Sequence, residues 1–379
     1  MSTVKRVLIV GAGVGGLSVA VVLRRHGISV EVVEQKTDWS FHGVGIIQPN
    51  NMLRALDRIG IANRCIQSGG SFPGWRVHDK DGAHLWDVST TNAAAPNLPA
   101  NNGISRSRFH SILTEAAISA GADIRMGVTV LSLKDEGNTV RARFPDGSAQ
   151  EYDLVIGADG IYSRVRSLVF GDTVSPRFIG QAAWRYSMPR PSSVTWGELF
   201  LGPDTKVGLV PMSTTEMYLF LLSAEPDNRR MDRSGLAVLM RDRLSTYTGL
   251  IADLREQITD NTGVIYKPIE TVMVPDPWHK GRVVLIGDAA HATTPHLAQG
   301  AAMAVEDALL LGDLLGGSGG IKEILEEFMI RRFERTRFVY NSCNQLSAWE
   351  MEEWAGKSNP EAQPGQLLQS VLLELMTDF

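Results

Sequence analysis

The chain has 379 residues, of which 44% are hydrophobic and 21% are charged, enough for a sizeable core and about two domains. Its formal net charge of −5 argues against a nucleic-acid-binding protein, because the totals force no basic face. The two cysteines, Cys65 and Cys343, and the histidines show no metal-ligand spacing, so we expect no metal and two reduced thiols in a cytoplasmic protein.

The first informative stretch is a strand, a glycine turn and a helix. Residues 7–10 form an apolar, β-branched run suited to a buried parallel strand, and Gly11, Gly13 and Gly16 follow with G-x-G-x-x-G spacing. Gly11 permits a tight turn, and Gly13 lets a pyrophosphate approach the helix N-terminus. Gly16 lets a helix over about residues 14–26 lie close to the sheet.

A second strand, over residues 28–33, follows this helix and ends at Glu34. A carboxylate there can accept hydrogen bonds from both ribose hydroxyls of an adenosine, so the whole unit predicts a bound dinucleotide. The basic residues 5–6 before the apolar stretch 7–23 resemble a targeting segment, but its glycines and the strand that follows favour a soluble, unprocessed chain.

The next part of the chain alternates helices, strands and turns. Residues 43–50 are predicted as a glycine-rich turn, and residues 66–104 as strands broken by a polar segment at 89–102. Residues 106–120 form an amphipathic pattern, which predicts a helix that packs on the first sheet. The other predictions here are a helix over residues 51–58 capped by Gly60, hairpin turns at 80–82 and 146–147, and strands over residues 125–130 and 139–144.

A second informative stretch begins with a buried strand over residues 154–156. The turn 157–160 contains Asp159, and a helix carrying Arg164 and Arg166 comes next. The residues alone leave two alternatives open for Asp159, a ligand contact or an ordinary helix cap.

From residue 177 to residue 274 the pattern changes to short strands separated by turns. It predicts an antiparallel meander followed by two helices, and it contains no nucleotide motif, so this region is the candidate substrate domain. The predicted strands contain Trp184 and Arg185, then residues 199–201, 207–212 and 217–222, and the predicted helices cover residues 234–247 and 251–258.

The third informative stretch is a buried strand over residues 283–286 that delivers Asp288 into a loop, followed by a helix that opens near Gln299. The Asp288 carboxylate and the free amides of the helix are two sets of polar groups that can bind an extended ligand. We interpret His291 and His296 as hydrogen-bonding loop residues rather than metal ligands. Residues 321–354 predict a long helical region, with Arg331, Arg332, Arg335 and Arg337 on a solvated face.

Three fingerprints in this sequence resemble those of the single-component flavoprotein aromatic hydroxylases. The first is Gly11 to Gly16 with Glu34, and the second is Gly157 to Gly160 with Ser163 and Arg166. The third is Gly287 to His291 with Pro295, Gln299 and Gly300, and the acidic pair Glu306 and Asp307. This family includes the para-hydroxybenzoate, salicylate, 6-hydroxynicotinate and urate hydroxylases, and the likeness covers nearly the whole chain.

The resemblance implies an α/β fold with a Rossmann-like FAD-binding domain, a mostly antiparallel substrate domain and a C-terminal helical region. The FAD-binding domain would comprise residues 1–70, 104–173 and 276–320, the substrate domain residues 71–103 and 174–275, and the C-terminal helices residues 321–379. FAD would be the bound cofactor, with NADH or NADPH as co-substrate. The residues implied to contact FAD are Gly11, Gly13, Val14, Gly15, Gly16, Glu34, Gln35, Arg106, Val130, Asp159, Asp288, Ala298, Gln299, Gly300, Ala301 and Ala302.

The resemblance also implies where the substrate binds. Lys206 and Tyr218 fall where relatives place polar pocket residues, so they would polarise the substrate, and Pro295 would shape the oxygen pocket. The alternatives are an exposed turn lysine, an ordinary strand tyrosine and a turn proline. The remaining candidates for the pocket are Trp184, Phe220, Leu222 and His296, with Gln48 and Arg185 as further polar residues.

The implied activity is hydroxylation of a small planar aromatic or N-heteroaromatic compound through a C4a-hydroperoxyflavin. The alternatives are a related flavoprotein that epoxidises or reduces an isoprenoid or polyketide, and a flavin-binding protein without turnover. We expect small-molecule partners, no nucleic acid, no membrane span, and a monomer or homodimer.

Overall fold

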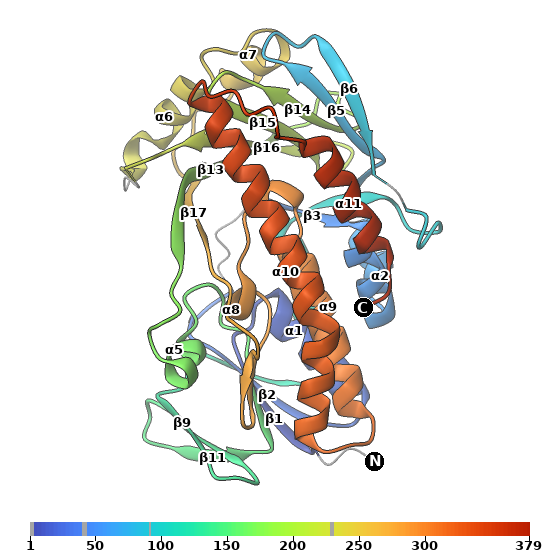
Figure 1. The fold of residues 1–379 in the computed structure, drawn as a ribbon, viewed down its shortest axis with the longest axis vertical. Coiled ribbons are helices and arrows are strands. Elements are labelled where there is room, and N and C mark those ends of the chain that lie inside the picture. The colour runs from blue at the N-terminus through green and yellow to red at the C-terminus, as the bar shows by residue number, and fades with distance from the viewer. Residues whose placement is uncertain (1–3, 40–43, 91, 228–230) are drawn as a thin grey trace.

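The structure is a computed structural model that describes residues 4–39, 44–90, 92–227 and 231–379. Two β-sheets occupy opposite ends of an elongated molecule, and one long helix, α10 (Ile321–Trp354), runs beside both (Figure 1). The fold is mixed α/β with a parallel Rossmann-like sheet, a mostly antiparallel sheet and C-terminal helices, as the sequence predicted. Among the helices of the described residues, none combines the length and the apolarity needed to cross a bilayer.

The first sheet has six strands in the order β18-β19-β12-β1-β2-β8, parallel except for β18. The strands β1, β12 and β19 are buried apolar runs, as expected for a sheet covered on both faces. Near the ends of these strands, Gly157 of the middle strand pairs with Val10 on one side and with Leu285 on the other. Because parallel strands end at the same edge, all three fingerprints begin side by side. The strands are β1 (Arg6–Val10), β2 (Ser29–Glu34), β8 (Asp123–Met126), β12 (Leu154–Gly157), β18 (His279–Lys280) and β19 (Val283–Leu285).

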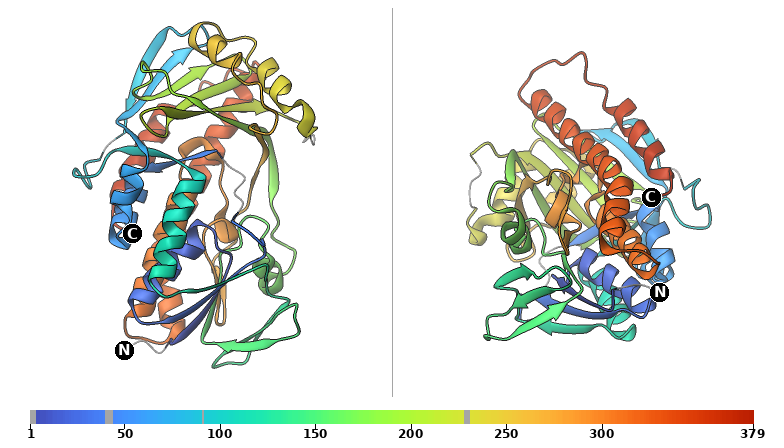
Figure 2. Two further views of the ribbon diagram at one scale, coloured as in Figure 1. Left: turned by 180° about the vertical axis from the view of Figure 1, so that it is seen from behind. Right: turned by 60° about the horizontal axis from the view of Figure 1, so that its bottom comes forward.

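Helices cover this sheet, and two small sheets flank it. The helices α1 and α9 pack against each other, and α4 also contacts α1 (Figure 2). The helices of this half are α1 (Val14–Arg25), α2 (Asn50–Ile59), α3 (Ala62–Gln67), α4 (Arg106–Ser119), α5 (Arg164–Phe170), α8 (Asp288–His291) and α9 (Gly300–Gly316). The small sheets consist of β3 (Gly45–Pro49), β7 (Asn101–Ser105) and β4 (Gly70–Phe72), and of β9 (Ser132–Asp135), β10 (Val140–Arg143) and β11 (Ala149–Tyr152).

The second large sheet has seven strands in the order β17-β13-β16-β15-β14-β5-β6, in which β14 and β5 pair in parallel and the other pairs are antiparallel. Its outer face packs on α6 (Leu236–Arg243) and α7 (Gly249–Arg255) through a separate hydrophobic cluster. Its inner face, which carries Arg185 and Tyr218, is turned toward the first sheet. The strands are β5 (Gly74–Asp79), β6 (His84–Ser89), β13 (Arg177–Pro189), β14 (Gly197–Leu201), β15 (Thr205–Pro211), β16 (Glu216–Ala224) and β17 (Ile265–Thr271).

Most predicted elements are present, with boundaries shifted by a few residues. The prediction of a turn over residues 43–50 is wrong for its described part, because residues 45–49 form strand β3, whose backbone pairs with β7. The edge strand β17 and the last helix, α11 (Pro364–Met376), were not predicted from the sequence. Two short 3₁₀ turns, Arg233–Gly235 and Pro295–Leu297, complete the set.

The arginine pattern in α10 was also misread. Arg331 and Arg337 are exposed, but Arg332 and Arg335 are buried and ion-paired. The sequence pattern cannot distinguish a solvated arginine from one whose charge meets a buried carboxylate, because the carboxylates come from another helix.

Gly13 and Gly16 provide a matched test of the turn. A Cβ at Gly16 would overlap the Gly11 carbonyl oxygen, whereas a Cβ at Gly13 meets no atom within 4 Å. Gly16→Ala should therefore lower the free energy of unfolding of cofactor-free protein by about 1 to 3 kcal/mol, the usual cost of overpacking. Gly13→Ala should change it by less than about 0.5 kcal/mol. Urea unfolding followed by circular dichroism measures both, and equal losses would contradict the packing role of Gly16.

Candidate active site

The N-terminus of α1 is an open anion site at the edge of the first sheet. Its N-cap is Gly13, which supplies no side-chain hydrogen bond to the first amides of the helix. Glu34, at the end of β2, accepts hydrogen bonds from the Ala12 amide (2.9 Å) and the Lys36 amide (3.0 Å). The turn thus holds a carboxylate beside helix amides that remain available for phosphate oxygens.

A buried histidine that the sequence analysis missed fastens this turn to α4. His110 Nε2 donates a hydrogen bond to the Ala12 carbonyl (2.7 Å), and Thr114 Oγ1 lies 3.1 Å from His110 Nδ1. Burial lowers the pKa of His110, so the neutral ring with a proton on Nε2 fits these contacts. Within the sequence, an amphipathic helix with His110 and Thr114 four residues apart was the only available signal.

The second fingerprint joins the first sheet to the third fingerprint. Asp159 accepts hydrogen bonds from the Ser163 hydroxyl and from the Val165 amide (3.0 Å), so its carboxylate supports the first turn of α5, whose N-cap is Ser163. Arg166 is buried and donates to the Ala289 carbonyl (2.9 Å). Both carboxylate oxygens of Asp159 already accept hydrogen bonds within the chain. The predicted contact of Asp159 with FAD stays a prediction. Val130, another predicted FAD contact, accepts a hydrogen bond from Arg164 at its carbonyl (2.7 Å).

The third fingerprint presents a carboxylate and a helix N-terminus together. The Asp288 side chain keeps solvent contact, although burial raises its pKa, and the charges of His291, Arg106 and Lys267 partly offset that rise. This combination is expected of a group inside a recess. A Cβ on Gly300, the first residue of α9, would lie 3.9 Å from Asp288 Oδ1. The Gln299 side chain does not cap α9 but pairs with Asn51, which leaves the first amides of α9 open.

Buried charges fix this loop and helix in place. Asp307 accepts hydrogen bonds from the Gly287 amide (2.9 Å), from His291 (2.6 Å) and from Arg332 (2.7 Å), and all of these side chains are buried. Burial by itself would raise the pKa of Asp307, but the attraction of His291 and Arg332 outweighs it and lowers the pKa to about 2. His291 is therefore a hydrogen-bonding residue, as the sequence analysis interpreted it.

The neighbouring acid, Glu306, extends the same buried network, which we call the α9–α10 charge network. Glu306 accepts hydrogen bonds from Arg332 (2.7 Å), Arg335 (3.0 Å) and Asn51 (2.8 Å). Burial would raise the pKa of Glu306, but the charges of Arg332 and Arg335 lower it. The network links α2, α9 and α10, so the opening of α9 has a fixed position.

The inner face of the second sheet approaches the opening of α9. Tyr218 and Ile47 belong to one hydrophobic cluster, and Phe220 packs against it, as does Ala298, the residue just before Gln299 and a predicted FAD contact. Gly45 is required here, because a Cβ would overlap the Tyr218 ring. Burial raises the pKa of Tyr218 to about 12, which keeps the phenol protonated as a hydrogen-bond donor.

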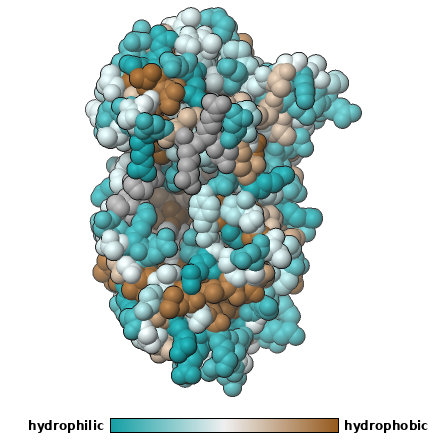
Figure 3. Space-filling view, turned by 90° about the vertical axis from the view of Figure 1, so that its left-hand side faces the viewer, coloured by the Kyte–Doolittle hydropathy of each residue, from teal (hydrophilic) through white to brown (hydrophobic). Residues whose placement is uncertain are grey.

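We call this space the central recess and define it by Arg106, Arg185, Tyr218, Lys267 and Asp288. These residues come from both halves of the chain, and the charge of Arg106 contributes to the pKa shifts of the other four. The space-filling view shows a hollow between the two halves with apolar side chains at its floor (Figure 3). The three fingerprints and the inner face of the seven-stranded sheet therefore surround one site.

Lys206, predicted to polarise the substrate, already has a counter-ion. Its Nζ pairs with the carboxylate of Glu350 in α10. The same carboxylate lies 3.0 Å from His296 Nε2 and accepts a hydrogen bond from Gln181 Nε2 (3.0 Å). Burial would raise the pKa of Glu350, but the Lys206 charge and the His296 hydrogen bond bring it to about 2. Burial lowers the pKa of His296, and Glu350 partly offsets that effect. Lys206 and His296 thus lie together, bound to α10.

The other predicted pocket residues lie in different parts of the structure. Phe220 and Arg185 lie on the inner face, and Pro295 begins the 3₁₀ turn before Ala298. The structure does not bring Trp184 into the central recess, because its indole is fully buried against α6 on the outer face and donates to Ser223 (2.9 Å). Gln48 is buried and accepts a hydrogen bond from Asn102 (2.8 Å).

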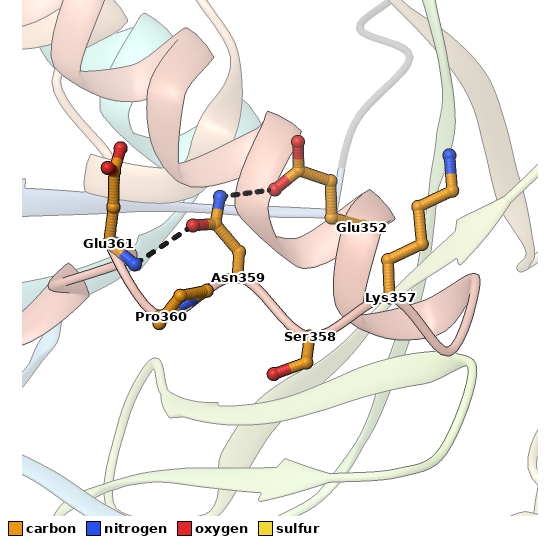
Figure 4. Close-up of a pocket in the computed structure, with 6 residues that line it drawn as sticks. All are labelled: Glu352, Lys357, Ser358, Asn359, Pro360 and Glu361. Atoms are coloured by element: carbon orange, nitrogen blue, oxygen red, sulfur yellow. Dashed lines mark hydrogen bonds between the residues drawn. The ribbon is translucent and has the colours of Figure 1, made fainter.

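A surface depression of about 330 Å³ lies elsewhere, in the loop between α10 and α11 (Figure 4). It is lined by Glu352 and residues 357–361, and its Asn359 donates to Glu352 (2.7 Å) and accepts from the Glu361 amide (3.0 Å). These polar groups satisfy one another, and none belongs to the central recess. Within the described residues, no group of His, Cys, Asp and Glu could hold a metal ion, and Cys65 and Cys343 are buried free thiols.

Comparison with known proteins identifies the chain's relatives. Residues 5–318 match the family model of an FAD binding domain. The chain is 32% identical to the 2-heptyl-3-hydroxy-4(1H)-quinolone synthase of Pseudomonas aeruginosa, over 91% of this chain and 90% of that protein. It is 30% identical to the FAD-dependent urate hydroxylase of Klebsiella oxytoca, over 88% of this chain and 87% of that protein.

The fold agrees with a solved structure. The crystal structure of Klebsiella pneumoniae HpxO complexed with FAD and uric acid superposes with a TM-score of 0.84 at 23% identity, over 99% of this chain and 98% of that chain. At this identity the likeness shows the fold.

The Glu350 contacts predict a pH dependence of stability. Because the pKa of Glu350 falls from 4.5 to about 2 on folding, its stabilisation is complete above pH 4.5 and is lost as pH falls toward 2. Glu350→Gln should be less stable than wild type near neutral pH and should lose less stability on acidification, the difference reaching at most about 2 to 3 kcal/mol. Urea unfolding of both proteins from about pH 6 to about pH 3 measures it, and parallel pH profiles would contradict the ion pair.

Proposed function

The chain belongs to the FAD-binding-domain family and is an FAD-dependent monooxygenase of the aromatic hydroxylase group, and we propose that it hydroxylates a small planar aromatic or N-heteroaromatic compound with NAD(P)H and O2. The observation that supports this most is that Ala298 and Phe220 both pack against the hydrophobic cluster that contains Tyr218. It sets the opening of α9 beside an aromatic wall, so a flat ring on that wall would lie against a ligand bound at α9.

The residues present fit FAD. The open N-terminus of α1 at Gly13 suits the pyrophosphate, since nothing in the chain fills the space where a Cβ would point. Glu34, held by two amides, suits the adenosine ribose. Asp288 has no side-chain hydrogen bond or ion pair with another described residue and suits the ribityl hydroxyls, while the amides from Gly300 onward suit negative charge on the ring.

FAD, reduced by NAD(P)H, supplies the activated oxygen when it is bound. The chain's own residues would orient the substrate and exclude water from the recess. Tyr218 would donate a hydrogen bond to a ring oxygen or nitrogen of the substrate, because its phenol stays protonated. Phe220 would stack against the substrate ring, and Pro295 would restrict the backbone of the turn before Ala298.

Lys206 and His296 would act as positioning residues. Glu350 pairs with the Lys206 ammonium and is hydrogen bonded to His296, so the Lys206 charge is balanced within the chain. Their proposed role is to hold the turn of residues 295–297 against the inner face, which sets the distance between the substrate wall and the opening of α9. NADH and NADPH are both compatible with this proposal.

Asp288 tests the cofactor part of the proposal. Purified protein should be yellow with about one FAD per chain, and Asp288→Ala should weaken FAD binding by about 1 to 3 kcal/mol, the cost of removing one buried hydrogen-bond partner. Fluorescence titration of apoprotein with FAD measures the loss. Asp123→Ala, an exposed acid on the edge strand β8, is the control and should bind FAD like wild type. Colourless protein that ignores FAD would overturn the proposal.

Tyr218 tests the substrate part. With a substrate found by screening for changes in the flavin spectrum, wild type should consume NAD(P)H and insert one atom from labelled O2. Tyr218→Phe should keep its FAD but lower the hydroxylation rate by about 10²- to 10³-fold, corresponding to about 2 to 4 kcal/mol, and release more hydrogen peroxide per NAD(P)H. Tyr186→Phe, on the outer face of the same sheet, is the matched control. Unchanged product yield in Tyr218→Phe would remove that residue from the site.

A further inference from the structure

The end of α11 joins the two helices that hold α9. We call residues 374–379, the last turn of α11 and the residues after it, the α11 strap. The end of the chain marked C lies beside α2, and α11 packs on α10 (Figure 1, Figure 2). Because α2 and α10 both pack on α9, the strap spans the two supports of the helix whose open N-terminus belongs to the candidate active site.

Arginines of α2 and α10 bind the strap through its backbone. Arg335 of α10 donates to the Glu374 carbonyl (2.6 Å) and to Thr377 Oγ1 (2.9 Å). Arg54 of α2 donates to the Met376 carbonyl (3.1 Å). Cations stabilise the C-terminal end of a helix, because its free carbonyls carry partial negative charge. Each of the two supporting helices thus supplies one charge that holds the strap in place.

The side chain of Phe379 lies over a cluster of guanidinium groups. Phe379 is only 7% exposed, and the guanidinium carbons of Arg332 and Arg335 lie 5.7 Å and 5.8 Å from its ring centroid. The guanidinium carbon of Arg58 lies 5.8 Å from the same point. Arg331 donates to the main-chain oxygen of Phe379 (2.7 Å), which fixes the backbone beside the ring. The face of an aromatic ring attracts cations, most strongly where water is excluded.

Two of these arginines belong to the α9–α10 charge network. Arg332 and Arg335 bind the buried carboxylates Glu306 and Asp307 of α9. Asp307 in turn holds the Gly287 amide, in the loop that precedes α9. Such ion pairs are strong while water is kept away, because a low local dielectric strengthens the attraction. The aromatic ring of the strap contacts the guanidinium side of these pairs and so helps to keep water from them.

We infer that Phe379 is a positioning residue for the cofactor-binding helix. Its ring holds the guanidinium groups of Arg332 and Arg335 in a dry environment, and through them it fixes the first amides of α9. Those amides stabilise the negative charge of a reduced flavin, so their placement affects the reduced cofactor more than the oxidised one. The inference rests on the proposed binding of FAD at α9 and goes beyond it, because Phe379 belongs neither to a fingerprint nor to the central recess.

The alternative is that Phe379 only adds apolar packing to α11. Val371, on the same helix, is buried in the same hydrophobic cluster as Phe379. Its aliphatic side chain has no aromatic face to offer the arginines. Shortening Val371 therefore removes apolar packing alone, which makes it the matched control.

The experiment compares Phe379→Leu, Phe379→Ala and Phe379→Tyr with wild type. Apoprotein is titrated with FAD by fluorescence, and the two-electron reduction potential of the bound flavin is measured in the loaded protein. Phe379→Leu should weaken FAD binding by about 10-fold. It should also make the potential more negative by about 30 mV, the shift for a tenfold difference between the losses of reduced and oxidised FAD.

Phe379→Ala should have a larger effect than Phe379→Leu, and Phe379→Tyr should behave like wild type because it keeps the aromatic face. If Phe379→Ala does not fold, Phe379→Leu still tests the aromatic contact, since it keeps an apolar side chain at this position. Val371→Ala should lower the melting temperature of the apoprotein, as the loss of buried methyl groups does, but keep the wild-type FAD affinity and potential.

Three results would overturn the inference while the proposed function stands. They are a wild-type FAD affinity and potential in Phe379→Leu, equal shifts of both in Phe379→Leu and Val371→Ala, and a loss in Phe379→Tyr as large as that in Phe379→Leu. In each of them wild type still binds FAD. Wild-type protein that binds no FAD would instead overturn the proposed function, and this inference with it.

Discussion

The site depends on one buried interaction, the α9–α10 charge network. Arg332 reaches from α10 to both Glu306 and Asp307 of α9, and Asp307 in turn holds the Gly287 amide just before Asp288. Removing one partner from such a network leaves an uncompensated buried charge, which costs about 3 to 5 kcal/mol. These contacts therefore hold the loop that carries Asp288 and the helix that opens at Gly300 in one relative position. A ligand that binds both Asp288 and the first amides of α9 would therefore contact groups in fixed relative positions.

The second constraint is the alternation of side chains in the seven-stranded sheet. Trp184 and Arg185 are adjacent in the chain, yet one is enclosed by α6 and the other faces the central recess. The same rule places Tyr218 and Phe220 together, while Met217 and Leu219 join the outer cluster. Two residues adjacent in the chain can thus lie in different environments, Trp184 in the outer hydrophobic cluster and Arg185 on the wall of the central recess.

Charge compensation distinguishes the lysines and arginines around the recess. Lys206 has Glu350, and Arg332 and Arg335 have Glu306, so these cations are satisfied within the chain. Arg106, Arg185 and Lys267, which define part of the central recess, have no carboxylate within 4.0 Å among the described residues. The sequence pattern therefore does not tell which cations are ion-paired, because the carboxylates that bind them come from other elements.

The sequence by itself determined the three fingerprints, their order and the cofactor they imply, because glycine positions and strand ends are local properties of the chain. It also determined that the middle of the chain is a meander and that residues 321–354 are helical. The tertiary structure decided which polar side chains share a space. His110 binds Ala12 across 98 positions, Glu350 binds Lys206 from another helix, and Arg332 is buried rather than solvated. Local patterns carry no record of such partners, since these contacts form only when distant segments pack together.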